Sequence, residues 1–448
     1  MNSMTIKKAA AVCGGKIYGS GDLNAPIGRA VIDSRLIEKG DMFVAYRGER
    51  TDGHAYISKA LDSGAACALA ERVPEGETRP VIVVDEVQKA LERIAAAYRQ
   101  TLNIPVVGIT GSVGKTSAKE MVWSVMSRAF NTLKTEGNLN NQIGVPMTLS
   151  SIERSHQAAV VEMGISGFGE MRLLSEMVRP TIGVFTVIGH AHLEFLHDLD
   201  GVLKAKTEML ELMDDTGTVI MNGDDEKLRG FKCRQRKLTF GIEKPCDIMA
   251  ENIVSEGSEG TRCTITYEDR RLDVYIPAYG KHLVYAALAA AGVGFTLGMS
   301  DEQIIAGIGD FQIVGRRGAV ITTDYLTLID DCYNANPDSV KCGIDSLMKT
   351  NGRRVCILSD MLELGENSPE MHHAVGKYAA EKGVDLIICT GPLSKYTCDG
   401  AGEQGVYFEN RSELIANLHW LINRGDTVLV KASHGMKLEE ISEELKRL

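Results

Sequence analysis

The chain has 448 residues, a net charge of −11 and 44% hydrophobic residues. This length indicates about three domains, and the ordinary composition excludes a disordered or fibrous chain, while the acidic balance argues against a protein that coats nucleic acid. The sequence contains no run near the ~20 apolar residues of a membrane helix, no secretory signal and no disulfide or zinc spacing among its ten cysteines, so we expect a cytoplasmic protein with reduced thiols.

Strand-like and helix-like segments follow one another along the chain. Before residue 84 the pattern predicts strands at 42–45 and 81–84 and a helix at 55–65. Beyond it, β-branched runs alternate with helical periods, which is typical of a parallel sheet. The expected segments are a helix at 87–101, a strand at 106–109, a helix at 115–130, a strand at 158–161, a helix at 168–177, a strand at 181–188 and a helix at 203–213.

A second pattern begins near residue 262. Two alternating strands around Glu268-Asp269 predict an antiparallel hairpin at 262–276, and a helix follows at 282–297. The strand–helix alternation then restarts, with strands at 326–329, 355–358, 386–389 and 428–430. We therefore predict an α/β protein of three domains, covering residues 1–83, 84–313 and 314–448.

A glycine-rich run joins the strand at 106–109 to the next helix, which is the setting of a phosphate-binding loop. Glycines allow backbone amides to face a polyphosphate, and a lysine and a hydroxyl then reach the β/γ-phosphates and Mg²⁺. Ile109 stands where the strict pattern has glycine, and the alternative is a glycine-rich turn with an incidental lysine. The residues that predict an ATP site are Thr110, Gly111, Ser112, Val113, Gly114, Lys115 and Thr116.

Three further side chains follow in the same predicted sheet. Glu162 stands at the end of the strand at 158–161, where a doubly wound sheet has its ligand crevice, and is a candidate Mg²⁺ ligand. His192 and Glu194 follow the next strand, where a metal or phosphate role and a surface or capping role are both open. Lys206 by itself has the pattern of a solvated helix lysine.

These motifs together resemble the Mur ligases of bacterial peptidoglycan synthesis. The shared features are the phosphate loop, Thr135-Glu-Gly-Asn-Leu-Asn-Asn141, Glu162-Met-Gly, His192-x-Glu194 and Lys206. The runs Asp330-Asp-Cys-Tyr-Asn-Ala-Asn-Pro337 and Leu358-Ser-Asp-Met-Leu-Glu-Leu-Gly365 resemble the member that joins D-alanyl-D-alanine to UDP-N-acetylmuramoyl-tripeptide. The residues at 33–35 and 43–54 are similar to its UDP-sugar-binding domain.

The resemblance implies a UDP-substrate domain, a central ATPase domain with a mainly parallel sheet, and a C-terminal Rossmann-like domain that closes over ATP. It implies ATP-driven amide formation through an acyl phosphate, with Lys115, Glu162, His192 and Lys206 in catalysis and with Lys206 carbamylated. Two Mg²⁺ ions would bind Thr116, Glu162, His192 and carbamylated Lys206. Further nucleotide contacts would come from His282, Arg316, Asp331 and Asn334. Substrate contacts would come from Ser34, Arg35, Arg47, Gly48, Thr51, Asp52, Asn138, Asn141, Tyr333 and Ser433.

Several positions depart from the family pattern: Val187, Leu283, Ala286, Ala432 and His434 replace its usual residues. These changes put a base contact and an anion contact in doubt, and they motivate one alternative, a non-catalytic nucleotide-binding regulator. Another amide ligase of the superfamily, such as a folylpolyglutamate or cyanophycin synthetase, is the second alternative, although the runs at 33–35 and 333–337 argue against it. We expect a monomer without nucleic-acid partners, and the third residue of the tripeptide, diaminopimelate or lysine, stays open.

Overall fold

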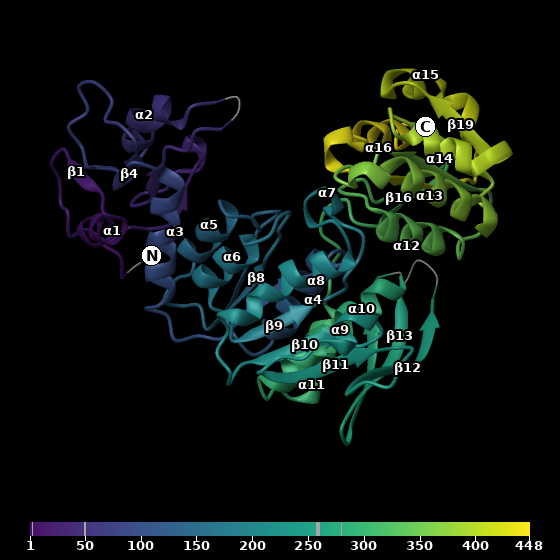
Figure 1. Cartoon of the computed structure of the whole chain (residues 1–448), viewed down its shortest axis with the longest axis horizontal. Helices are drawn as coiled ribbons and strands as arrows, with labels where there is room; N and C mark the ends of the chain where they lie inside the picture. Colours follow the sequence, from purple (N-terminus) through teal and green to yellow (C-terminus); the bar gives the residue numbers. More distant parts are fainter. Residues whose placement is uncertain (2, 49–50, 257–259, 279) are drawn as a thin grey trace.

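The computed structural model describes residues 1, 3–48, 51–256, 260–278 and 280–448, and they form three sheets in chain order. Figure 1 shows the first sheet with the purple N-terminal segment, the second with the teal and green middle, and the third with the yellow-green C-terminal segment. The α/β class and the mostly parallel pairing are confirmed. Within the described residues, no helix has the length and apolar character needed to cross a bilayer.

The N-terminal sheet has the strand order β1-β5-β4-β3-β2, in which only β1 is antiparallel to its neighbour. Thr5 caps the first helix by accepting from Lys8 N, and Gly14 ends it with φ 73°. The elements are α1 (Ile6–Cys13), β1 (Lys16–Tyr18), β2 (Ala30–Val31), η1 (Ser34–Leu36), β3 (Met42–Val44), η2 (Gly53–Tyr56), α2 (Ile57–Asp62), β4 (Cys67–Ala70) and β5 (Val81–Val83).

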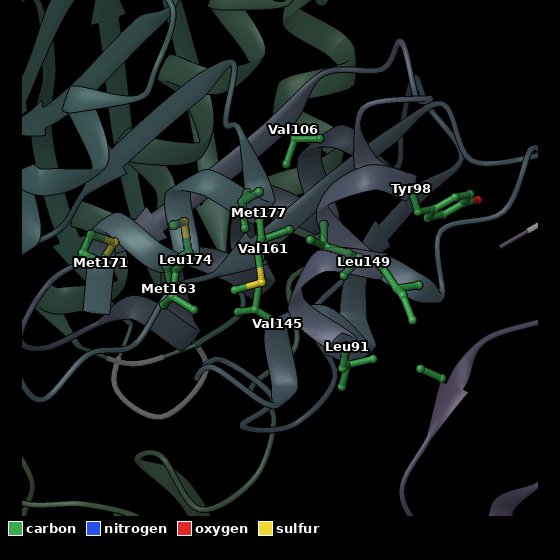
Figure 2. Close-up of a cluster of buried hydrophobic side chains, with 14 of the residues drawn as sticks. Leu91, Tyr98, Val106, Val145, Leu149, Val161, Met163, Met171, Leu174 and Met177 are labelled. Atoms are coloured by element: carbon green, nitrogen blue, oxygen red, sulfur yellow. The ribbon is translucent and has the colours of Figure 1, made fainter. Parts of the chain in front are cut away.

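Helix α3 (Val87–Arg99) connects the first sheet to the second. Its apolar side chains recur at helical spacing, and it packs against α1 on one side and against α5 and α6 on the other. Figure 2 shows Leu91 and Tyr98 of this helix together with Leu149, Val161 and Met177 in one buried cluster. Because this cluster is continuous, the core of the first domain runs into that of the second, and the boundary at residue 84 stays a prediction.

The central sheet has the order β14-β13-β12-β11-β10-β9-β6-β8-β7 and is parallel from β7 to β12. Its strands are β6 (Val106–Thr110), β7 (Thr132–Lys134), β8 (Ala158–Glu162), β9 (Ile182–Phe185), β10 (Thr218–Asn222), β11 (Arg236–Gly241), β12 (Ile248–Ser255), β13 (Thr261–Tyr267) and β14 (Arg270–Ile276). Its helices are α4 (Lys115–Met126), α5 (Gly144–Ser150), α6 (Glu170–Val178), α7 (Leu193–Leu196), α8 (Leu199–Thr207), η3 (Glu208–Glu211), α9 (Glu226–Gly230), α10 (Lys281–Thr296) and α11 (Asp301–Gly309).

The C-terminal sheet has the order β15-β16-β20-β17-β18-β19, and only β15 is antiparallel to its neighbour. Asn336 and Ser339 form a capping box at the start of α12, with Pro337 in its first turn. The elements are β15 (Ala319–Thr322), β16 (Thr327–Asp330), α12 (Pro337–Leu347), β17 (Arg354–Ser359), η5 (Gly365–Asn367), α13 (Ser368–Lys382), β18 (Leu386–Thr390), α14 (Ser394–Ala401), η6 (Gly402–Gln404), β19 (Gly405–Phe408), α15 (Arg411–Leu421), β20 (Thr427–Lys431), η7 (His434–Met436) and α16 (Glu439–Leu445).

The expected elements are present, with changes at several of their ends. The helix expected at 115–130 stops at Met126, and the one expected at 55–65 is the turn η2 followed by α2. The strand expected at 181–188 stops at Phe185, because the chain then leaves the sheet: Thr186 Oγ1 donates to Val113 O, 2.6 Å away, and Ser112 N donates to Val187 O. The helix expected at 203–213 begins at Leu199, where Asp198 caps it, and becomes a 3₁₀ turn after Thr207. The hairpin at 262–276 is confirmed as β13 and β14.

Candidate active site

A cavity of about 630 Å³ lies where the three sheets meet. Tyr46 of the N-terminal domain and Gln88 of α3 line one end, and side chains of the C-terminal domain line the other. Among the described residues predicted for the site, those that line the cavity are Ser112, Val113, Gly114, Lys115, Thr116, Asn141, Glu162, His192, His282, Asp331, Tyr333 and Asn334. Those that do not are Thr110, Gly111, Lys206, Arg316, Asn138, Ser433 and the predicted substrate residues at 34–52.

The phosphate loop turns sharply between β6 and α4. Gly111 and Gly114 have φ of 148° and 82°, and a Cβ at Gly111 would lie 1.9 Å from Thr186 Oγ1. Only glycine fits this conformation and this approach. Lys115 Nζ donates to Gly111 O over 2.7 Å, and burial lowers the pKa of this ammonium while Glu162 opposes the shift. The loop therefore offers a helix N-terminus and a half-buried lysine to an anion in the cavity.

Glu162 is the centre of a hydrogen-bonded cluster behind the phosphate loop. Thr116 Oγ1 donates to its Oε2 over 2.9 Å, and Asn140 Nδ2 donates to its Oε1 over 2.8 Å. Lys119 Nζ lies 3.7 Å from Oε2 and donates to the carbonyl of Thr135. Glu162 is 1% exposed, so these partners hold a buried carboxylate that would otherwise be costly to keep charged.

Lys206 is buried on α8, close to Lys115 but behind the cavity wall. It is 1% exposed, and its Nζ has no hydrogen-bond or ion-pair partner among the described residues. Burial, and secondarily the charge of Lys115, lower the pKa of Lys206 well below its ordinary value. A solvated helix lysine is therefore the wrong interpretation of this position, because the side chain is buried and burial disfavours its charged form.

The segment after β9 meets the C-terminal domain at two carboxylates. His190 N and Nδ1 both lie near Asp338 Oδ2, at 2.6 and 3.0 Å, and His192 Nδ1 is hydrogen-bonded to Glu363. Glu194 does not join His192 in a metal cluster; it contacts the C-terminal domain through its backbone, which donates to Glu363 O. Ser112 Oγ donates to Gly189 O and thereby ties this segment to the phosphate loop.

The C-terminal wall is built on the ends of β16 and β20. Lys431 Nζ donates to Asp331 Oδ2 over 2.7 Å and to Asn334 O over 2.9 Å. His282 lines the same cavity; its buried Nδ1 has no hydrogen-bond partner within the described part of the chain, and burial lowers the pKa of this imidazole. An orphaned ring nitrogen at a cavity wall is suited to a polar atom of a ligand.

Two adjacent arginines take different positions. Arg317 lines the cavity with its guanidinium carbon 3.8 Å from the ring centre of Tyr333. Arg316, the predicted nucleotide contact, is instead held by Asp330 at 3.0 Å and by Glu443 at 2.6 Å. Of the two arginines, Arg317 is therefore the one that faces the cavity. Its neighbour joins β16 to α16.

The other predicted substrate residues serve local structure here. Asn141 Oδ1 accepts from Gly144 N at the start of α5 over 2.9 Å, and Ser433 Oγ accepts from Leu362 N over 3.0 Å. Asn138 is exposed on the surface. In the N-terminal domain, Arg35 pairs with Asp33 at 2.6 Å, and Asp52 accepts from Arg72 at 2.7 Å. Their predicted contacts with a UDP-sugar stay predictions.

Several residues of this site have no role in the sequence-based prediction, among them Lys119, Asn140, Arg317 and Glu363. Lys119 lies one helical turn after Thr116, so a face analysis of α4 could have found it. Asn140 and Glu363 lie inside the motifs on which the resemblance is based, but a sequence motif does not show which residue each side chain contacts. Glu363 pairs with a residue 171 positions away, and such a contact has no local signal.

Comparison with known proteins agrees with this architecture. Three family descriptions match in succession: "Mur ligase family, catalytic domain" at residues 27–102, "Mur ligase middle domain" at 109–294 and "Mur ligase, glutamate ligase domain" at 315–434. The chain belongs to the Mur ligase family and is thus an ATP-dependent, amide-forming ligase.

Relatives with a printed activity cover the whole chain. The UDP-N-acetylmuramoyl-tripeptide–D-alanyl-D-alanine ligase of Bacillus subtilis is 34% identical over 455 residues, which cover 99% of each chain. A crystal structure of MurF from Acinetobacter baumannii superimposes with a TM-score of 0.89 at 30% identity, covering 99% of both chains. The structure of MurF ligase from Thermotoga maritima in complex with ADP has a TM-score of 0.83 at 26% identity and covers 96% of this chain and 99% of its own.

Proposed function

We propose that this protein joins D-alanyl-D-alanine to UDP-N-acetylmuramoyl-tripeptide with hydrolysis of ATP, giving the pentapeptide precursor of peptidoglycan, ADP and phosphate. The observation that carries the proposal is the cavity itself, where the phosphate loop, Glu162 and the run 331–334 of the C-terminal domain line one space. The relatives of matching length whose printed name is this activity support the same assignment.

The chemistry follows from the poor leaving ability of a carboxylate oxygen. The tripeptide carboxylate attacks the γ-phosphorus of ATP, ADP leaves, and an acyl phosphate forms. The amine of the dipeptide then attacks the acyl carbon, a tetrahedral intermediate collapses, and phosphate and a proton leave. Lys115 and the amides of the phosphate loop are placed to stabilise the charge that develops on the transferred phosphoryl group.

Mg²⁺ fits the donor atoms at the cavity floor. Thr116 and Glu162 present hard oxygen atoms side by side, which is the ligand type of this ion. Among the described residues no three His, Cys, Asp or Glu side chains form a complete metal cluster, so phosphate oxygens and water would supply the other ligands. We assign Thr116, Glu162, His192 and carbamylated Lys206 as ligands of two Mg²⁺ ions. The ions would neutralise the negative charge of the phosphates.

The carbamate of Lys206 is supported by its burial. Carbon dioxide reacts with an uncharged amine, and the pKa of Lys206 is lowered by burial and by Lys115. The product is an anion, which would balance the positive charge of Lys115 next to it and supply oxygen ligands. The burial of Lys206 thus supports for this chain the carbamate that the family resemblance implies.

The remaining assignments complete the proposal. The domains end near residues 83 and 313, the first binds the UDP-sugar, and the third closes over ATP and receives the dipeptide near Tyr333. The protein acts as a cytoplasmic monomer. Closure of the third domain would exclude water and protect the acyl phosphate from hydrolysis.

A phosphate-release assay with both substrates tests the proposal. We expect release to require ATP, UDP-N-acetylmuramoyl-tripeptide and D-alanyl-D-alanine together, and to fall on the order of 100-fold or more in Lys115→Ala. Lys7→Ala, an exposed lysine outside the cavity, is the matched control. Running the assay with the diaminopimelate and the lysine tripeptides identifies the preferred third residue. Release with glutamate acceptors instead would indicate another ligase, and ATP binding without joint dependence would indicate a regulator.

A further inference from the structure

Two histidines in one short segment are each paired with a carboxylate of the C-terminal domain. His190 Nδ1 lies 3.0 Å from Asp338, whose first-turn position on α12 also lets it accept from His190 N. His192 Nδ1 is hydrogen-bonded to Glu363 Oε2. In Figure 1, α7, which begins beside His192, lies against the C-terminal domain. The position of that domain therefore decides what both imidazoles contact.

The backbone on both sides of the second pair is unusual. His192 has φ 57° and Glu363 has φ 62°, a region that residues other than glycine seldom adopt. Glu194 N donates to Glu363 O over 3.2 Å, so main chain and side chain connect the same two segments. Backbone in such a conformation persists where surrounding contacts hold it.

The pairing has a chemical consequence for the imidazole of His192. Glu363 Oε2 is the partner of His192 Nδ1, and a glutamate side chain is an ionised carboxylate at neutral pH that can only accept. The hydrogen must then be on Nδ1, which leaves the lone pair on Nε2. Both residues line the cavity, and Nε2 is the ring nitrogen that remains for a ligand there.

We propose that Glu363 is a positioning residue that sets the tautomer and the ring orientation of His192 from across the domain interface. The proposal rests on the proposed function, because it takes from there the role of His192 at the phosphate site. It adds that His192 has the Nδ1–H tautomer, with Nε2 available to a ligand, only while the C-terminal domain holds Glu363 against it. Ser112 of the phosphate loop donates to Gly189 O of the same segment, so the loop that would bind the nucleotide also contacts the segment that carries His192.

Substitutions at Glu363 can separate this role from simple interface packing. Glu363→Asn suits the positive φ, because asparagine adopts this region more readily than most residues, but its side chain is too short to reach His192. Glu363→Gln keeps the length and one oxygen acceptor. Asp338→Asn changes the other histidine pair at the same interface, and Glu366→Gln removes an exposed charge three residues away that has no partner among the described residues.

The first readout is the tautomer of His192 in the ligand-free protein, measured by ¹⁵N NMR of histidine-labelled samples and assigned with His192→Gln. We expect the Nδ1–H form in the wild type, Glu363→Gln, Asp338→Asn and Glu366→Gln, and a shift toward Nε2–H in Glu363→Asn. The second readout is phosphate release, where Glu363→Asn should lower kcat about 10- to 100-fold, the usual cost of losing such a partner. Glu363→Gln should recover most of that loss.

An unchanged His192 tautomer in Glu363→Asn overturns the proposal, and so does an equal shift in Asp338→Asn. If Glu363→Asn unfolds, Glu363→Gly, which also accepts the positive φ, replaces it with the same expected shift. Failure of the proposed function would give a different result, because phosphate release by the wild type would then not depend on both substrates. The tautomer measurement needs no substrate and still decides the role of Glu363.

Discussion

The hydroxyl of Thr116 donates to Oε2 of Glu162 across 2.9 Å, although 46 residues separate them in the chain. The parallel pairing of β6 with β8 brings the two together, because it places the end of β8 beside the phosphate loop. Glu162, the last residue of β8, and Thr116, in the first turn of α4, thus bring their side-chain oxygen atoms together. This pair is the geometric basis of the proposed Mg²⁺ site.

Lys119 stabilises the same carboxylate from the protein side. It lies 3.0 Å from Glu120 and 3.7 Å from Glu162, and all three are buried. We expect Lys119→Met to lower the free energy of unfolding by about 3–5 kcal/mol, because it leaves the buried carboxylate of Glu162 without its cation, whereas Glu120 keeps Lys134. Urea unfolding measures the loss, and Lys119→Met with Glu162→Gln should recover part of it. A loss no larger than that of the surface control Lys7→Met would contradict this account.

Lys206→Ala should reduce phosphate release on the order of 100-fold, because the carbamate oxygens that would hold Mg²⁺ at the transferred phosphoryl group are lost. Added bicarbonate should not restore the activity, since the amine is gone, whereas short carboxylic acids should restore part of it by entering the vacated space. Lys204→Ala, an exposed lysine on the same helix, is the control and should keep its activity. An unmodified Lys206 ammonium in a high-resolution structure grown with bicarbonate would count against the carbamate.

Arg317 and Arg316 are expected to differ in what they affect. Arg317→Ala should raise the KM for ATP about 10- to 100-fold, as for the loss of a hydrogen bond to a charged group. Arg316→Ala should mainly lower the melting temperature, because Asp330 is 1% exposed and loses its partner. Kinetics and thermal unfolding of both variants check this assignment. A larger KM effect for Arg316→Ala would show that domain closure exchanges the two arginines.

His372 predicts a pH dependence of the segment that carries Glu363. Its Nε2 accepts from Met361 N over 2.9 Å and its Nδ1 donates to Ser368 O over 2.7 Å, and burial lowers its pKa below 6.5. Above pH 6.5 the imidazole is neutral in both the folded and the unfolded state. Below it the unfolded state binds a proton that the folded state resists, so stability falls as the pH decreases.

Hydrogen exchange of the peptide containing Met361 measures this effect directly. We expect its protection to fall between pH 6.5 and 5 in the wild type and in His419→Gln, which alters an exposed histidine of the same domain. His372→Gln cannot be protonated there and should show little change over that interval. An equal loss of protection in His372→Gln would refute the role of this histidine.

Local patterns in the chain were sufficient for much of the fold. Alternating β-branched runs predicted the parallel strands β6, β8, β9, β16, β17, β18 and β20, and Glu268-Asp269 predicted the hairpin. In the second and third sheets the strands β7, β10, β11, β12, β15 and β19 were not predicted, although β10 and β15 contain β-branched runs. The strands β10, β11 and β12 pack against α10, which follows all three in the chain.

The sequence by itself determined the class of fold, the phosphate loop and the identity of Glu162 and His192 as candidates, because these depend on periodicity, glycine conformation and residue chemistry. Only the tertiary structure decided that Lys206 is a buried amine, that Arg317 faces the cavity in place of Arg316, and that Glu363 holds His192. The contact of Glu363 with His192 depends on the packing of one domain against another, whereas the burial of Lys206 and the ion pairs of Arg316 depend on the packing of separate segments within one domain. The charge of −11 and the length of 448 residues carry no information about such contacts.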